Sequence, residues 1–154
     1  MIYGNTFLNE EYIMEAKFGM TKEEILKDPD KAVNIIKDMT NKKTENNSDI
    51  ISACLFVLGI IGMGAGLAST TIGGIGLISI LAATIIDTLN KSGKARIMTY
   101  SEYEKNARAT KKTIVNTINN INKEISKTTD KQKLETLKKE KSELENILNK
   151  VKRV

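Results

Sequence analysis

The chain of 154 residues contains no histidine, no tryptophan, one proline and one cysteine, and only 5% of its residues are aromatic. Histidine is the usual proton carrier near neutral pH, so its absence weakens any acid–base or nucleophilic mechanism. Metal sites need clusters of Cys, His or carboxylate ligands, and no such cluster stands out. The lone Cys54 has no partner for a disulfide within the chain, and we expect it to be a buried small hydrophobe. These absences predict a protein that is not an enzyme and that has no cofactor and no metal.

Charge divides the chain into an acidic head, an uncharged middle and a basic tail. Residues 1–49 carry seven lysines and ten acids, whereas residues 88–154 carry seventeen basic residues and eight acids. The 37 residues from Ile50 to Ile86 contain no charge and seven of the ten glycines. The first fifteen residues are polar and acidic, so we expect no secretory signal peptide.

Composition and turn signals predict an all-α protein of four segments. These are a leader (1–20, with one helical turn near 9–17), short amphipathic helices with a linker (21–48), a hydrophobic Gly-rich helical hairpin (49–89) and a charged helical hairpin (100–154).

Short motifs mark the expected helix starts. The capping-box spacing, Ser or Thr followed three residues later by Glu or Gln, occurs at Thr21/Glu24, Ser101/Glu104 and Thr129/Gln132. Asp28 followed by Pro29 predicts a further start, because proline at the first helical position gives up an N–H that would have no partner. An apolar stripe follows that start, made of Ala32, Val33, Ile35, Ile36 and Met39.

The uncharged middle is too long for one membrane span, which takes ~20 residues and rarely more than ~25. Two helical passes of about 17 residues fit it better, with a tight turn at "GLASTTIGG", where small and hydroxyl residues cluster. A β interpretation is weaker, because the polar–apolar alternation of half-buried strands is absent and glycine weakens strand interiors.

Glycines in this hairpin predict close contact between helix backbones. In lipid, helix association depends on small residues that let backbones approach, and in a helix glycine costs ~1 kcal/mol relative to alanine. The candidate packing and oligomerisation residues are Gly59, Gly62, Gly66, Gly73, Gly74 and Gly76. A hairpin buried in a protein core would use small residues in the same way, so both settings stay open. If the hairpin inserts, the basic residues Lys91, Lys94 and Arg96 predict that both termini are cytosolic.

The tail carries two heptad seams that are out of phase with each other. The first seam consists of Ile114, Ile118, Ile121 and Ile125, and the second of Leu134, Leu137, Leu144, Leu148 and Val151. An antiparallel coiled-coil hairpin explains the change of phase, and one long helix with a phase break is the alternative. Lysines in this tail are interleaved with Glu135, Glu140, Glu143 and Glu145, which predicts a solvated helix surface. Nucleic acid is the less favoured partner, because no aromatic residues offer a stacking platform.

Two triplets near the N-terminus carry a family resemblance. "FLNEE" places Leu8 two residues before Glu10, and "YIMEAK" places Ile13 two residues before Glu15. These triplets resemble the Leu/Ile-x-Glu sites at which prohead proteases trim internal proteins of tailed bacteriophages. The resemblance implies a virion setting for this chain.

The functional expectation is a non-catalytic structural or assembly protein of a phage virion. Its partners are other copies of itself or other structural proteins, and its hydrophobic hairpin packs in an oligomer or inserts in the host membrane. Two alternatives stay open, a two-pass, holin-like pore-forming membrane protein and a soluble basic coiled-coil adaptor that binds nucleic acid.

Overall fold

The computed structural model describes residues 13–42, 46–63, 71–72, 75–95 and 98–150. The helices are α2 (Lys22–Lys27), α3 (Pro29–Asn41), α4 (Asn47–Ile61), α5 (Leu77–Ala95), α6 (Tyr100–Lys127) and α7 (Lys131–Lys150), and the strands are β1 (Thr71–Ile72) and β2 (Ile75–Gly76). The predicted all-α class is confirmed. The two short strands pair antiparallel with each other, Thr71 opposite Gly76, and form a two-stranded sheet.

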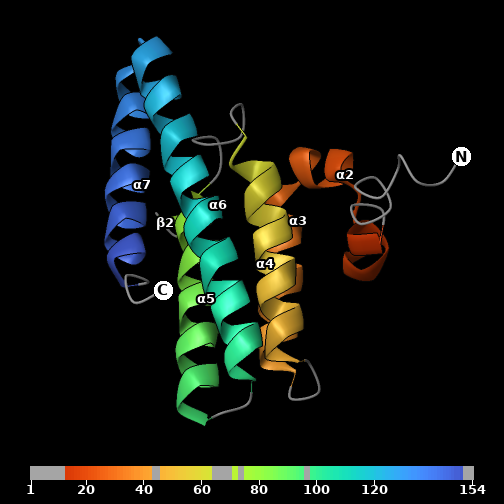
Figure 1. Cartoon of the computed structure of the whole chain (residues 1–154). Coiled ribbons are helices and arrows are strands. Elements are labelled where there is room, and N and C mark those ends of the chain that lie inside the picture. The colour runs from red at the N-terminus through yellow and green to blue at the C-terminus, as the bar shows by residue number, and fades with distance from the viewer. Residues whose placement is uncertain (1–12, 43–45, 64–70, 73–74, 96–97, 151–154) are drawn as a thin grey trace, which may run out of the picture.

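The helices lie side by side in an order that places α4 inside the bundle (Figure 1). Helix α7 lies at one side and packs on α5 and α6; these two pack on α4, and α4 packs on α2 and α3. Every residue of α4 from Ile50 to Ile61 is buried or half-buried. A helix that is apolar on all sides needs such surroundings. Helix α4, the first part of the uncharged middle, therefore lies in a protein core.

The two apolar helices, α4 and α5, differ in length and in their connection from the predicted passes of about 17 residues joined by a tight turn. Helix α4 ends at Ile61, and the N–H of the C-cap residue Gly62 donates to the carbonyl of Leu58 at 2.8 Å. Helix α5 begins only at Leu77, after the β1–β2 pair. Closely spaced glycines, which are poor helix formers, follow Ile61 in the sequence and account for the early end. The helices run in opposite directions (Figure 1) and pack on each other.

Local capping signals define the two short helices near the N-terminus. The Thr21 hydroxyl accepts from the Glu24 N–H, and the Glu24 carboxylate accepts from the Thr21 N–H, each at 3.2 Å. Asp28 caps α3 by accepting from the Lys31 N–H at 3.1 Å, with Pro29 at the first position. Both predicted starts are confirmed, and the residues that α3 buries, Ala32, Val33 and Ile36, belong to the predicted stripe.

The other two predicted capping boxes are wrong. Thr99, rather than Ser101, caps α6 and accepts from the Glu102 N–H at 3.2 Å, while Glu104 pairs with Arg108. At the start of α7 the Asp130 carboxylate accepts from the Gln132 N–H at 3.0 Å, in the place expected for Thr129. In both cases a second capping residue lies within two positions of the predicted one, and the fold uses that residue.

The leader is more ordered than the sequence predicts over its second half. Residues 13–18 are helical, and Phe18 and Met20 are buried. The rings of Phe18 and Phe56 meet edge to face, with centroids 6.0 Å apart, which joins this segment to α4. Residues 1–12, including Leu8 and Glu10, lie outside the described residues.

Helix α5 buries hydroxyl side chains without leaving them unsatisfied. Thr84, Thr88 and Ser92 each donate to the backbone carbonyl four residues earlier, at 2.7–2.8 Å. Ser92 also accepts from the Asn47 side chain at 2.9 Å, which joins the end of α5 to the start of α4. Between residues 77 and 92, the exposed side chains of α5 form a narrow stripe of Ala83, Asp87, Asn90 and Lys91.

The tail forms two helices, since α6 ends at Lys127 and α7 begins at Lys131. The predicted seam residues divide into two sets. Four are fully buried, namely Ile114, Ile121, Leu137 and Leu144. Four others, Ile118, Ile125, Leu134 and Leu148, are half-buried, and Val151 lies outside the described residues. Because α6 packs on α4 and α5 as well as on α7, its buried stripe also includes Ala107, Thr110 and Thr117. A coiled coil between α6 and α7 stays a prediction.

Candidate functional site

The end of α4 touches α6 through a glycine. The side-chain amide of Asn120 donates to the Gly62 carbonyl at 2.7 Å, and so satisfies one of the free carbonyls at the end of α4. A Cβ placed on Gly62 would lie 2.7 Å from the Thr117 hydroxyl. The absence of a side chain at Gly62 therefore allows a close contact between α4 and α6 within one chain.

The remaining candidate glycines behave differently from one another. A Cβ on Gly59 would meet no described atom within 4 Å, so packing does not require glycine there. A Cβ on Gly76 would overlap the Glu140 carboxylate of α7. Gly66, Gly73 and Gly74 lie outside the described residues. Of the six candidates, the described structure explains Gly62 and Gly76 by close contact.

Glu140 is a buried acid that the sequence pattern assigned to the solvated surface, and that assignment is wrong. Only 4% of Glu140 is exposed, and its carboxylate accepts from the Ser79 hydroxyl at 2.8 Å. Burial raises the pKa of the Glu140 carboxyl above its usual value. One sequence signal was present, because Glu140 lies three residues after Leu137 and four before Leu144, on the same helix face.

A groove lies beside the Gly62 contact, between the end of α4 and the middle of α6. Gly59 and Met63 line one side, and the other side carries amides and hydroxyls that include Asn116 and Asn119. Among the described residues that line the groove, Lys123 is the one with an ionisable side chain. These residues offer hydrogen-bond donors and acceptors, without an acid–base pair among them.

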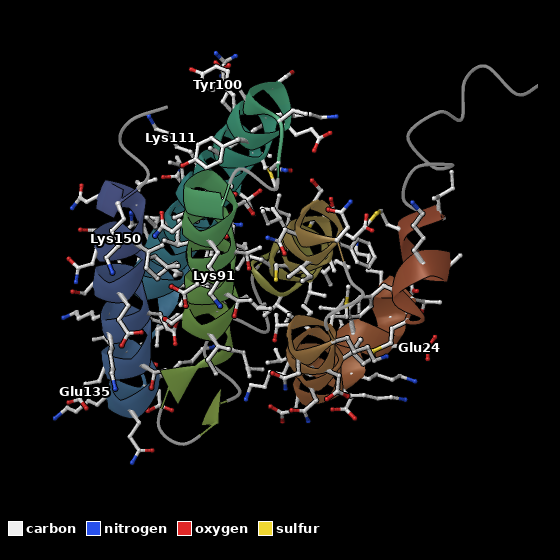
Figure 2. The ribbon with its side chains drawn as sticks, turned by 90° about the horizontal axis from the view of Figure 1, so that it is seen from below. Glu24, Lys91, Tyr100, Lys111, Glu135 and Lys150 are labelled. Carbon is white, nitrogen blue, oxygen red and sulfur yellow. The ribbon has the colours of Figure 1, made fainter. Side chains whose placement is uncertain are left out.

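Charged side chains occupy the outer surface of the bundle (Figure 2). The labelled residues Lys91 of α5, Lys111 of α6, and Glu135 and Lys150 of α7 are all exposed. On α7, Lys141 pairs with Glu145 at 3.9 Å, one helical turn away. The interleaved acids and bases of the tail thus form a mixed-charge surface, apart from the buried Glu140.

Within the described ranges, no three Cys, His, Asp or Glu side chains come together in a way that would hold a metal ion. No helix in the described part of the chain combines the length and the apolar character needed to cross a bilayer. Neither a protein-family model, nor a curated protein, nor a solved structure matches this chain.

Two glycine substitutions, one within α4 and one at its C-cap, should have opposite effects on the free energy of unfolding. Gly59→Ala is expected to raise the free energy of unfolding by about 1 kcal/mol, because alanine favours the helix and its methyl group meets open space. Gly62→Ala is expected to lower it by about 1–3 kcal/mol, because the new methyl group overlaps Thr117. Urea unfolding followed by circular dichroism measures both, and a stabilising Gly62→Ala would contradict the close contact.

Proposed function

We propose that this chain is a non-catalytic helical assembly protein of a phage virion, which stores an apolar hairpin inside a helical bundle and releases it into the host membrane. The hairpin consists of α4, the glycine-rich connection and α5. The virion setting derives from the resemblance of Leu8-x-Glu10 and Ile13-x-Glu15 to prohead protease sites. The membrane step derives from the character of the hairpin.

The observation that carries the proposal is that α4 has no polar face between Ile50 and Ile61. Each of these residues is buried or half-buried by α2, α3, α5 and α6. If these helices separate from α4, it exposes apolar surface on every side, which water disfavours and lipid accepts. The connection is also uncharged, so it can cross a bilayer without moving a charge through hydrocarbon.

Insertion requires more than separation of the helices. At 15 residues, α4 measures about 22 Å, against a hydrocarbon layer of ~30 Å. The glycine-rich residues after Ile61 would have to extend the helix, a change that contact with lipid favours because unpaired backbone groups are costly there. The bundle is thus the stored form, and the inserted form has longer helices.

Oligomerisation through Gly62 is a less favoured role for the closed bundle. The Gly62 backbone is already in contact with Thr117 and Asn120 of the same chain. A second copy could reach this surface only after α6 leaves. We therefore propose that hairpins associate with each other only after α4 has separated from α6, when Gly62 can pack on another helix.

A disulfide between α4 and α6 should block insertion. Gly62→Cys with Thr117→Cys places two Cβ atoms close together, because an ideal Cβ on Gly62 lies 3.2 Å from the Thr117 Cγ2 atom. Cys54→Ala prevents mispairing, and Phe56→Trp adds a single fluorophore, since the chain has no tryptophan. With vesicles of phosphatidylethanolamine and phosphatidylglycerol that carry brominated acyl chains, the reduced protein should lose at least about half of its tryptophan emission. The oxidised protein should lose almost none.

The reduced protein is the matched control, because it has the same sequence without the crosslink. Quenching that is absent in both forms would contradict membrane insertion. Equal quenching in both forms would contradict release of α4 from α6. Chemical crosslinking of the inserted sample then separates single hairpins from the oligomers that a pore requires.

A further inference from the structure

One carboxylate joins α7 to the start of α5. Glu140 of α7 is 4% exposed, and its Oε2 atom accepts from the Ser79 hydroxyl at 2.8 Å. Its Oε1 atom lies where a Cβ of Gly76 would be, at 1.1 Å from the ideal position. We call Glu140, Ser79 and Gly76 the interhelical cap.

The position of this carboxylate follows from what α5 lacks. The residue before the helix is Gly76, which has no side chain to accept from the N–H groups of the first turn. Glu140 caps α5 although it belongs to α7. Its carboxylate also accepts a hydrogen bond from the backbone N–H of Ser79, the third residue of α5. The helix dipole at this N-terminus also favours the ionised carboxylate, but it acts against the cost of burying a charge, and burial is the largest influence on the pKa of Glu140. The missing side chain of Gly76 leaves the space that the carboxylate fills.

We propose that the interhelical cap is a protonation-controlled contact that regulates release of the hairpin, with α7 separating from α5 when Glu140 ionises. This inference rests on the proposed function, since it concerns the step that uncovers α5. In this proposal the bundle begins to open where α7 contacts the N-terminus of α5, next to the glycine-rich connection.

The direction of the control follows from the surroundings of the carboxyl. Burial raises the pKa of Glu140, the Ser79 hydrogen bonds lower it, Glu143 raises it and Lys139 lowers it. Both charged neighbours belong to α7; no described group of α5 or α6 is among the charges that shift this pKa. Because the pKa is raised in the closed bundle, the closed form holds the proton more tightly than the open form. The contribution to closure is complete below the usual value of 4.5 and is lost as pH rises through the raised pKa.

Thiol labelling of α7 in buffer without lipid tests this contact. In a Cys54→Ala chain, Leu144→Cys places a thiol on the buried face of α7, and Leu148→Cys provides a second, half-buried position if the first variant does not fold. Labelling rates with a methanethiosulfonate reagent are measured from pH 4.5 to 8 with Glu140 and with Glu140→Gln. At each pH the labelling rate of the chain with Glu140 is divided by the rate of the Glu140→Gln chain. This ratio cancels the pH dependence of the thiol itself. We expect this ratio to rise with pH, by about tenfold for each unit by which the pKa is raised.

Three controls make the result specific to the cap. Glu135→Gln on the exposed face of α7 should leave the rise in the ratio intact. Gly76→Ala should abolish the rise although Glu140 is present, because the new methyl group displaces the carboxylate. In a chain without the added thiol, native Cys54 should stay protected over the same range. A flat ratio, or a Cys54 thiol that reacts as fast as the α7 thiol, would overturn the proposal. Since no lipid is present, either result is independent of the vesicle experiment.

Discussion

Ile114→Ala is expected to lower the free energy of unfolding by about 2–5 kcal/mol, and Ile118→Ala by no more than about half as much. Ile114 is 0% exposed on the face of α6 that packs into the bundle, so its removal leaves a cavity with lost apolar contacts. Ile118 is half-buried, and water can fill part of the space. Urea unfolding followed by circular dichroism measures both values.

The comparison also distinguishes two descriptions of α6. A simple heptad seam gives both isoleucines equal weight, because each points at a single partner helix. In the bundle, α6 contacts α4, α5 and α7 at once, and the stripe through Ile114, Thr117 and Ile121 is the most buried. Equal losses for the two variants would favour the simple seam.

Cys54 should react with thiol reagents at pH 8 at least roughly a thousandfold more slowly in the native protein than in urea. Burial raises the pKa of this thiol from 9.0 to about 12, and the nucleophile is the thiolate. That difference alone reduces the thiolate fraction by roughly a thousandfold, and complete burial of Cys54 in α4 adds a barrier to access. An aromatic disulfide reagent that releases a coloured thiolate when it reacts with Cys54 allows the rate to be measured by absorbance.

The same pKa predicts how stability depends on alkaline pH. Because the folded protein holds the thiol proton more tightly than the unfolded chain, this contribution is complete below pH 9 and is lost as pH rises toward 12. A Cys54→Ala chain should lack this part of the alkaline loss. Rapid labelling of the native thiol at pH 8 would contradict the buried position of α4.

Features that depend on neighbours in the sequence could be predicted from it. The Thr21/Glu24 capping box and the Asp28–Pro29 start involve residues three or fewer apart, so the pattern itself contains both partners. The apolar stripe of α3 follows in the same way from helical periodicity. Where two capping residues lie close together, as with Thr99 and Ser101, the pattern does not say which one the fold will use.

Contacts between distant residues account for what the sequence did not predict. The hydrogen bond between Glu140 and Ser79 joins residues 61 apart in the chain, and the one between Asn120 and Gly62 joins residues 58 apart. Glu140 lies between two lysines in the sequence, a pattern that indicates a solvated helix surface. The sequence does not show that Glu140 meets the N-terminus of α5. The predicted role of the glycines in hairpin packing and oligomerisation stays a prediction; in the closed bundle Gly62 instead contacts a threonine and an asparagine of α6. A Cβ on Gly59 would meet no described atom within 4 Å, so close contact does not account for that glycine.

The hydroxyl groups of α5 have a consequence for a change of solvent. Thr84 and Thr88 donate to carbonyls of their own helix, so neither requires a neighbouring helix or water as acceptor. The energetic penalty that polar side chains normally suffer in hydrocarbon is therefore largely met in advance at these two positions. At these two positions the transfer of α5 between an aqueous protein and an oily environment is opposed mainly by the packing that the helix leaves behind. The exposed Asp87 and Lys91 of the same helix carry charges instead and stay costly to move into hydrocarbon.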